Sequence, residues 1–242
     1  MADNNRKMKT TAIVLAAGSG RRMGSSTKKQ FMLLEGKPVI AYSLEAFEKS
    51  PLIDAIILVT GEDEIEYCRR EIKEKFLFDK IKEITAGGAE RYDSVYNGLC
   101  KCPPDTDIVM IHDGARPFVT DEIISRTFED ACRYGACTAG VRSKDTVRIA
   151  DADGTAVSTP DRDNVWQIQT PQAFTYAAAL NSYKQLEENK RAFSEQGVKI
   201  TDDAMVVERF TGIRPHLTEG SYSNIKITTP EDLICGKSFL KK

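Results

Sequence analysis

The chain has 242 residues, enough to bury a substantial core in one large α/β domain or two small ones. Its net charge of −2, with basic and acidic residues interspersed, argues against the strong positive field of a nucleic-acid-binding protein. No apolar run reaches the roughly 20 residues that span a bilayer. Residues 1–10 are polar and basic, without the apolar segment of a secretory signal. We therefore expect a cytoplasmic protein without nucleic-acid or membrane partners.

The sequence offers little material for a zinc site. It has six cysteines, none in a C-x-x-C pair, and two histidines. We expect the cysteines to be free thiols, as is usual in a reducing cytoplasm.

Apolar runs alternate with amphipathic stretches over the first 141 residues. Short, β-branched runs that are apolar on both sides are typical of buried parallel strands. They occur at residues 11–16, 55–60, 107–112 and 136–141, and residues 80–86 predict a weaker strand. Helical periodicity predicts helices over residues 38–50, 63–76, 89–100 and 121–133. This alternation predicts a Rossmann-like, mostly parallel sheet with helices on both faces, joined by right-handed crossovers.

The alternation stops between residues 142 and 170, which are polar and show no helical period. Asp153 and Gly154 stand between two short β-prone pairs, so we predict a β-hairpin with these two residues at its turn. An isolated hairpin is only marginally stable in water. A hairpin that projects from an α/β body needs a surface to pack on, and a second copy of the chain is the economical candidate. We therefore expect one domain over residues 1–242, with residues 142–170 as a projecting dimerisation arm.

The last part of the chain returns to regular elements. The pattern predicts helices over residues 176–193, 202–210 and 230–240, and short extended segments at residues 213–217 and 224–228. Thr229 is the expected N-cap of the closing helix.

A glycine-rich, basic loop follows the first predicted strand, at the end where open parallel sheets bind ligands. Its glycines and basic residues are Gly18, Gly20, Arg21, Arg22, Gly24, Lys28 and Lys29. The glycine spacing is one residue too long for the dinucleotide fingerprint, and no glycine of the loop precedes a lysine as a P-loop requires. Glycines let backbone N–H groups approach phosphates and the cations neutralise them, which favours a nucleoside triphosphate. The alternative is a surface turn with solvated charges.

The loop resembles the opening signature of sugar-phosphate nucleotidyltransferases, L-A-A-G-x-G-x-R-M-G followed by K-Q-F. The later motifs resemble, in order, those of the 2-C-methyl-D-erythritol 4-phosphate cytidylyltransferase family. They are G-G-A-E-R (87–91), H-D-G-A-R-P (112–117), K-D-T (144–146), D-R (161–162), Q-T-P-Q-A-F (169–174), T-D-D (201–203) and N-I-K-I-T (224–228). The sequence departs from the family at Lys28, where proline is common, and at Gly114, where alanine is usual.

This resemblance implies an enzyme that transfers CMP from CTP to 2-C-methyl-D-erythritol 4-phosphate and releases pyrophosphate. It also implies Mg²⁺ or another divalent cation, and a homodimer formed through the arm. Three alternatives stay open. They are a relative acting on another polyol phosphate such as ribitol 5-phosphate, a dinucleotide-dependent oxidoreductase, and a regulator that binds a nucleotide without catalysis.

The resemblance also implies roles for individual residues. Catalytic stabilisation of charge on the α-phosphate and the leaving pyrophosphate is assigned to Arg22 and Lys29. The nucleotide is expected against Ala16, Ala17, Gly18, Gly20, Gly88, Ala89, Ser94 and Asp113. The acceptor substrate is expected at Arg116, Thr146, Arg162, Thr201 and Lys226, with Arg162 entering the site of a neighbouring subunit. Asp113 is the candidate metal ligand, and His112 is interpreted as structural. Whether Lys28 shares the role of Lys29 stays open.

Overall fold

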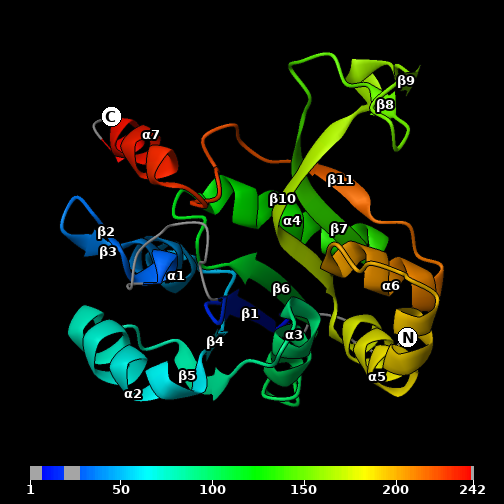
Figure 1. Ribbon diagram of the computed structural model, residues 1–242. Coiled ribbons are helices and arrows are strands. Elements are labelled where there is room, and N and C mark those ends of the chain that lie inside the picture. The colour runs from blue at the N-terminus through cyan, green and yellow to red at the C-terminus, as the bar shows by residue number, and fades with distance from the viewer. Residues whose placement is uncertain (1–6, 19–27, 241–242) are drawn as a thin grey trace.

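A computed structural model of the protein describes residues 7–18 and 28–240. Its centre is a seven-stranded sheet in the order β11-β7-β10-β6-β1-β4-β5 (Figure 1). The strands are β1 (Thr10–Leu15), β4 (Ala55–Thr60), β5 (Ile81–Ala86), β6 (Ile108–Asp113), β7 (Ala136–Arg142), β10 (Trp166–Thr175) and β11 (His216–Glu219). β10 runs antiparallel to β6 and β7, whereas the other neighbours are parallel. The predicted mostly parallel sheet is confirmed.

Helices cover both faces of this sheet, as the sequence predicts. Successive strand residues point to opposite faces, so Ala12 and Val14 pack into one core while Ile13, between them, packs into the other. The first core is closed by α1 (Val39–Lys49) and α4 (Asp121–Tyr134), and the second by α3 (Arg91–Leu99), α5 (Tyr176–Glu195) and α6 (Asp203–Thr211). Each helix buries its apolar stripe against the strands, which is what makes an amphipathic sequence stable as a helix here.

The remaining elements lie at the periphery. The helix predicted over residues 63–76 is helical but irregular: a 3₁₀ turn and α2 (Ile65–Tyr67) lead into a π-helical segment, η4 (Cys68–Glu74). A small hairpin of β2 (Leu33–Leu34) and β3 (Lys37–Pro38) was not predicted, and α7 (Pro230–Leu240) lies against it (Figure 1). No helix within residues 7–18 and 28–240 combines the length and apolar character that crossing a membrane requires.

The arm carries the predicted hairpin, formed by β8 (Ile149–Ala150) and β9 (Ala156–Ser158). Gly154 adopts a φ of +83° in the turn, a conformation that favours glycine. The Asp151 carboxylate accepts hydrogen bonds from the backbone N–H groups of Asp153 and Thr155. In Figure 1 the hairpin stands away from the sheet, beyond the C-terminal end of β7 and the N-terminal end of β10.

Strand β10 was missed in the sequence, and the predicted boundary of the arm is wrong as a result. Trp166 pairs with Arg142 of β7, so residues 166–170 belong to the central sheet and residues 143–165 lie outside its ladder. The polar residues Gln169, Thr170 and Gln172 hid the strand from a search for apolar runs. All three are buried, and they form hydrogen bonds inside the protein.

Helix α3 approaches the sheet closely at Gly98. A Cβ atom at this position would lie 2.7 Å from Ile13 Cγ2 and 3.0 Å from Val59 Cγ2. We predict that Gly98→Ala lowers the free energy of unfolding by about 1–3 kcal/mol through overpacking, although alanine is the better helix former. Urea unfolding measures the change. A variant as stable as the wild type would contradict the close packing of α3 on β1 and β4.

Candidate active site

A cavity of about 390 Å³ opens at the carboxyl ends of the neighbouring strands β1 and β6. Nine residues with a predicted role line it: Ala16, Ala17, Gly18, Lys29, Gly88, Ala89, Ser94, Asp113 and Lys226. Leu15, Gln30, Glu90, Arg91 and Ala115 complete the lining. Gly20 and Arg22 lie outside the residues that the structure describes.

The register of the sheet explains why residues so distant in the sequence meet here. Leu15, the last residue of β1, is level with Asp113, the last residue of β6. The ladder continues past both strands, since Ala16 N–H donates to Val59 O and Gly114 N–H donates to Leu15 O. The loops after β1 and β6 therefore leave the sheet at the same edge, from fixed positions.

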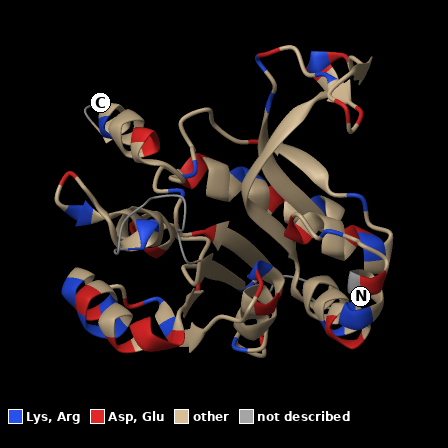
Figure 2. Ribbon diagram, in the orientation of Figure 1, with Lys and Arg blue, Asp and Glu red and all other residues tan. Residues whose placement is uncertain are grey.

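The Asp113 carboxylate lies among three cationic side chains. Lys226 Nζ is 2.7 Å from Oδ2, Arg91 Nε is 3.4 Å from Oδ1, and Arg116 Nε is 3.8 Å from Oδ2. Burial raises the pKa of Asp113, but the charges of Arg91, Lys226 and Arg116 outweigh burial and hold that pKa well below its usual range. Asp113 ends β6, a strand whose residues are all buried, and it lies beside a cation from each of three segments. Acidic and basic segments lie interspersed over the fold (Figure 2).

Arg91, at the start of α3, is held from its other side by a buried carboxylate. Its Nη1 and Nη2 are each 2.7 Å from an oxygen of Asp203, a bidentate contact. The hydroxyl of Tyr183 also donates to Asp203. Burial lowers the pKa of Arg91, but Asp203 and Asp113 outweigh burial and hold it well above the ordinary value. Arg91 is thus a permanent cation of fixed position at the pocket.

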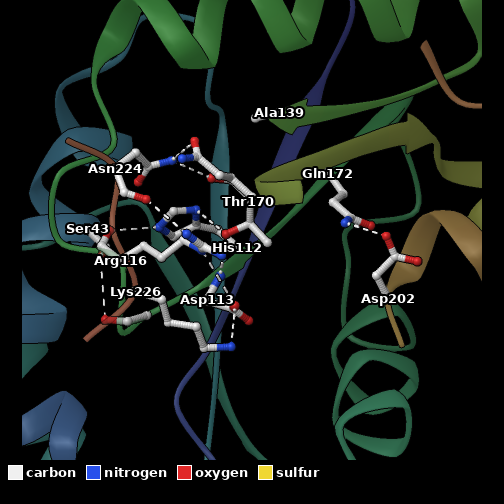
Figure 3. A network of polar contacts seen from close by, with 12 residues as sticks. Ser43, His112, Asp113, Arg116, Ala139, Thr170, Gln172, Asp202, Asn224 and Lys226 are labelled. Carbon is white, nitrogen blue, oxygen red and sulfur yellow. Dashed lines mark hydrogen bonds and ion pairs between the residues drawn. The ribbon is translucent and has the colours of Figure 1, made fainter. Parts of the chain in front are cut away.

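Behind Asp113 lies a neutral polar network (Figure 3). Thr170 Oγ1 accepts from the Asp113 backbone N–H at 3.1 Å and lies 3.0 Å from His112 Nδ1. His112 Nε2 is 3.1 Å from Arg116 O, so a neutral ring with its proton on Nε2 satisfies both contacts. Burial is the main cause that lowers the pKa of His112 to about 4. The interpretation of His112 as structural agrees with these contacts.

Lys226 reaches the pocket from a segment that the same network anchors. Asn224 is fully buried, and its Nδ2 donates to Thr170 O at 2.9 Å. The backbone carbonyl oxygen of Asn224 accepts a hydrogen bond from Arg116 Nη1 at 2.9 Å. The cation two residues further on is therefore placed by contacts with β10 and with the loop after β6 (Figure 3).

The structure separates the two adjacent lysines of the loop. Lys29 lines the cavity. Lys28 Nζ is 2.6 Å from Glu64 Oε1, and Glu64 also accepts from the Gly61 backbone N–H. Lys28 thus pairs with Glu64, just before α2, and Lys29 lines the pocket.

Four predicted residues do not line the cavity within one chain. Arg116 lies just behind it, with its side chain 13% exposed. Thr201 is exposed ahead of α6, and Thr146 and Arg162 lie on the arm. Arg162 Nε is 3.9 Å from Asp163 Oδ1, and its side chain is 60% exposed.

Sequence reasoning left Gln30, Arg91 and Asp203 without a role. All three stand inside the motifs K-Q-F, G-G-A-E-R and T-D-D, so the signal was present. Their side-chain partners come from distant segments, and the motifs by themselves do not identify those partners.

A mostly parallel α/β sheet whose first strand leads into a glycine-rich segment beside a ring of cations defines a Rossmann-like nucleotide-binding protein. The chain belongs to the 2-C-methyl-D-erythritol 4-phosphate cytidylyltransferase family, whose family model matches residues 10–242.

Individual relatives agree with this assignment. A protein of Lachnoclostridium phytofermentans named 2-C-methyl-D-erythritol 4-phosphate cytidylyltransferase is 50% identical over 234 residues, 97% of each chain. One of the same name from Clostridium kluyveri is 47% identical over 230 residues, 95% of this chain and 96% of its own. The crystal structure of 4-diphosphocytidyl-2C-methyl-D-erythritol synthase from Anaerococcus prevotii superposes with a TM-score of 0.84 at 33% identity, covering 98% of this chain and 97% of that one.

The buried His112 predicts a pH-dependent stability. In the unfolded chain a histidine binds a proton below about pH 6.5, whereas His112 in the folded protein stays neutral down to about pH 4. Between these values the unfolded state binds more protons, so the free energy of unfolding falls as the pH falls. We predict that His112 contributes about 3 kcal/mol to this loss between pH 6.5 and pH 4.

Urea unfolding at several pH values measures this loss. His112→Asn is the comparison, because asparagine does not titrate. The slope of stability against pH should be shallower in this variant. Equal slopes in the two proteins would contradict a neutral, buried His112.

Proposed function

We propose that the cavity at the carboxyl ends of β1 and β6 is where this enzyme joins its two anionic substrates. As a family member the chain is a cytidylyltransferase, which transfers the cytidylyl group of CTP to 2-C-methyl-D-erythritol 4-phosphate in the non-mevalonate route to isoprenoids. The observation that carries the site is the meeting of the segment Ala16–Gly18 with Lys29, Arg91 and Lys226 in one cavity.

The reaction requires charge stabilisation more than proton transfer. A phosphate oxygen of the acceptor attacks the α-phosphorus of CTP, and the bond from that phosphorus to the bridging oxygen of the β-phosphate breaks. Pyrophosphate leaves with the electron pair. The attacking phosphate is already ionised at neutral pH, so no general base is needed, and His112 is not required as one. Catalysis then comes from alignment and preorganised cations.

The nucleotide is assigned to the lining that precedes α3 and follows β1. Gly88 N–H donates to Ser94 Oγ at 3.1 Å, and a Cβ atom at Gly87 would lie 2.5 Å from the Ala17 Cβ. These segments are therefore packed closely, which suits recognition of the cytosine by backbone groups of Gly88 and Ala89. The triphosphate would extend past Ala16, Ala17 and Gly18 toward Lys29, with Gly20 and Arg22 completing the loop.

The divalent cation is assigned to the nucleotide. Within residues 7–18 and 28–240, no three His, Cys, Asp or Glu side chains converge to hold a metal ion. A protein cage is not needed, because Mg²⁺ is commonly held by one or two carboxylates together with substrate phosphates. Asp113 lines the cavity and is ionised, so it fits that limited role. When bound, the cation would neutralise part of the triphosphate charge.

The acceptor phosphate is assigned to Lys226 and Arg116, with Thr201 in the surrounding shell. Thr146 and Arg162 stand on the arm, which supports a site completed by a second copy of the chain. Ile149 and Val157 on this arm are 53% and 65% exposed, and a partner subunit would cover them. We assign the protein as a homodimer in which Arg162 reaches the cavity of its partner.

The enzyme is assigned to the cytoplasm. All six cysteines lie in the described part of the chain and are free thiols, as expected in a reducing compartment.

Release of pyrophosphate from CTP tests this function. We expect turnover with 2-C-methyl-D-erythritol 4-phosphate that falls on the order of 10²-fold in kcat in Lys29→Ala, because a preorganised cation is lost. The matched control is Lys28→Ala, whose partly exposed ion pair with Glu64 is worth about 0–1 kcal/mol. Its kcat should stay within about threefold of the wild type.

The choice of acceptor is tested in the same assay. Faster turnover of ribitol 5-phosphate than of 2-C-methyl-D-erythritol 4-phosphate would overturn the proposed substrate. Equal losses in the two lysine variants would overturn the distinct role of Lys29.

The arm is tested by mixing two defective variants. Lys29→Ala and Arg162→Ala should each be impaired as homodimers. After subunit exchange, a mixed dimer contains one cavity with both residues intact if Arg162 acts across the interface. An equal mixture should recover about a quarter of wild-type activity, since about half of the dimers are mixed and each has one intact site. No recovery, or a monomer by light scattering, would contradict the assignment.

A further inference from the structure

Gln30 connects the segment that precedes the glycine-rich loop with the segment that follows it. The residue is 2% exposed and lines the cavity beside Lys29. Its side-chain Nε2 donates to Ala16 O and, at 3.2 Å, to Gly18 O. One buried amide thus bonds the carbonyl groups on both sides of Ala17.

The backbone that carries Gln30 is itself firmly placed. Gln30 is the middle residue of a 3₁₀ turn, η2 (Lys29–Phe31), in which Phe31 N–H donates to Lys28 O at 2.9 Å. Phe31 belongs to the core on one face of the sheet, and its ring meets the Tyr67 ring edge-on at a centroid distance of 5.1 Å. The Gln30 amide is therefore a rigid anchor rather than a surface side chain that finds the loop by chance.

The two hydrogen bonds determine how the segment Ala16–Gly18 presents its backbone. A peptide unit is planar, and its N–H points opposite to its C=O. The Ala16 carbonyl and the Ala17 N–H belong to the same peptide unit. The hydrogen bond from Gln30 to this carbonyl therefore points the Ala17 N–H away from the Gln30 side chain. Backbone N–H groups that bind phosphates must face the ligand before it arrives. Ala17 and Gly18 line the cavity, so their orientation matters for binding.

Only an amide of this length supplies what the site uses. A methionine of similar size would leave both carbonyls without the donor, and at the buried Ala16 an unsatisfied carbonyl is costly. An ionised glutamate would direct acceptor oxygens at two carbonyl oxygens. The nitrogen of Gln30, more than its bulk, is the functional feature.

We propose that Gln30 is a positioning residue for nucleotide binding. Its amide aligns the backbone of residues 16–18 with Lys29, so that the phosphate-facing backbone and the neighbouring cation form one unit. This inference rests on the proposed function only in taking the triphosphate of CTP as the ligand of that unit.

Steady-state kinetics and calorimetric CTP binding test this role in Gln30→Met. We expect the KM for CTP and the Kd for CTP to rise about tenfold, the effect of losing hydrogen bonds that orient a binding segment. The KM for the acceptor should change less than about twofold. A role limited to packing would lower the fraction of folded enzyme, hence kcat, and leave both CTP constants unchanged. Gln185→Met, on the exposed face of α5, is the matched control.

A second variant tests the donor directly. In Gln30→Glu, burial should raise the pKa of the introduced carboxyl group, and only its protonated form can donate to a carbonyl. The ratio of its KM for CTP to that of the wild type should therefore fall at least about threefold from pH 8 to pH 6. The same ratio for Gln30→Met should not depend on pH.

A KM for CTP within about twofold of the wild type in Gln30→Met would overturn the proposal. If that variant does not fold by circular dichroism, the pH response of Gln30→Glu decides, and a ratio independent of pH overturns the proposal. A wild-type protein that binds CTP without releasing pyrophosphate would refute the proposed function, while calorimetry on the same variants would still judge Gln30.

Discussion

The arrangement of the site depends on placing a carboxylate, Asp113, at the buried end of a central strand. An ionised group there is costly unless it is paired and hydrogen-bonded. Lys226, Arg91 and Arg116 provide the pairing, and each comes from a different part of the chain. The same carboxylate thus draws together α3, the loop after β6 and the C-terminal segment. Asp203, on α6, is a second buried carboxylate that pairs with Arg91.

This arrangement has a direct chemical consequence. Cations held by buried partners do not have to be ordered when an anionic substrate arrives, so their charge is available without reorganisation. Because its pKa is held well below the usual range, Asp113 stays ionised throughout the neutral pH range. Behind it, the neutral contacts of His112, Thr170 and Asn224 fix the backbone without adding charge. Arg116 connects the electrostatic part of the site to the positioning part, because it lies beside Asp113 and also donates to the Asn224 carbonyl oxygen.

The sequence predicted this protein unevenly, and for identifiable reasons. Strands with continuous apolar runs, such as 55–60, were found to the residue, because burial on both faces leaves a signal in composition. Strand β10 was missed because its buried residues include glutamines and a threonine whose hydrogen bonds exist only in the folded sheet. The ion pair of Lys28 was likewise beyond the sequence. Its partner Glu64 is 36 positions from Lys28 in the chain and 2.6 Å from it in the fold.

The sequence by itself determined the class of fold, the hairpin and, through ordered motifs, the family. These follow from local periodicity, turn residues and motif order, which a linear chain displays. Tertiary structure alone decided which charged groups face one another: Arg91 with Asp113 and Asp203, and the Gln30 amide with the backbone after β1. Such pairings depend on strand register and helix placement, so they exist only once distant segments pack into one core.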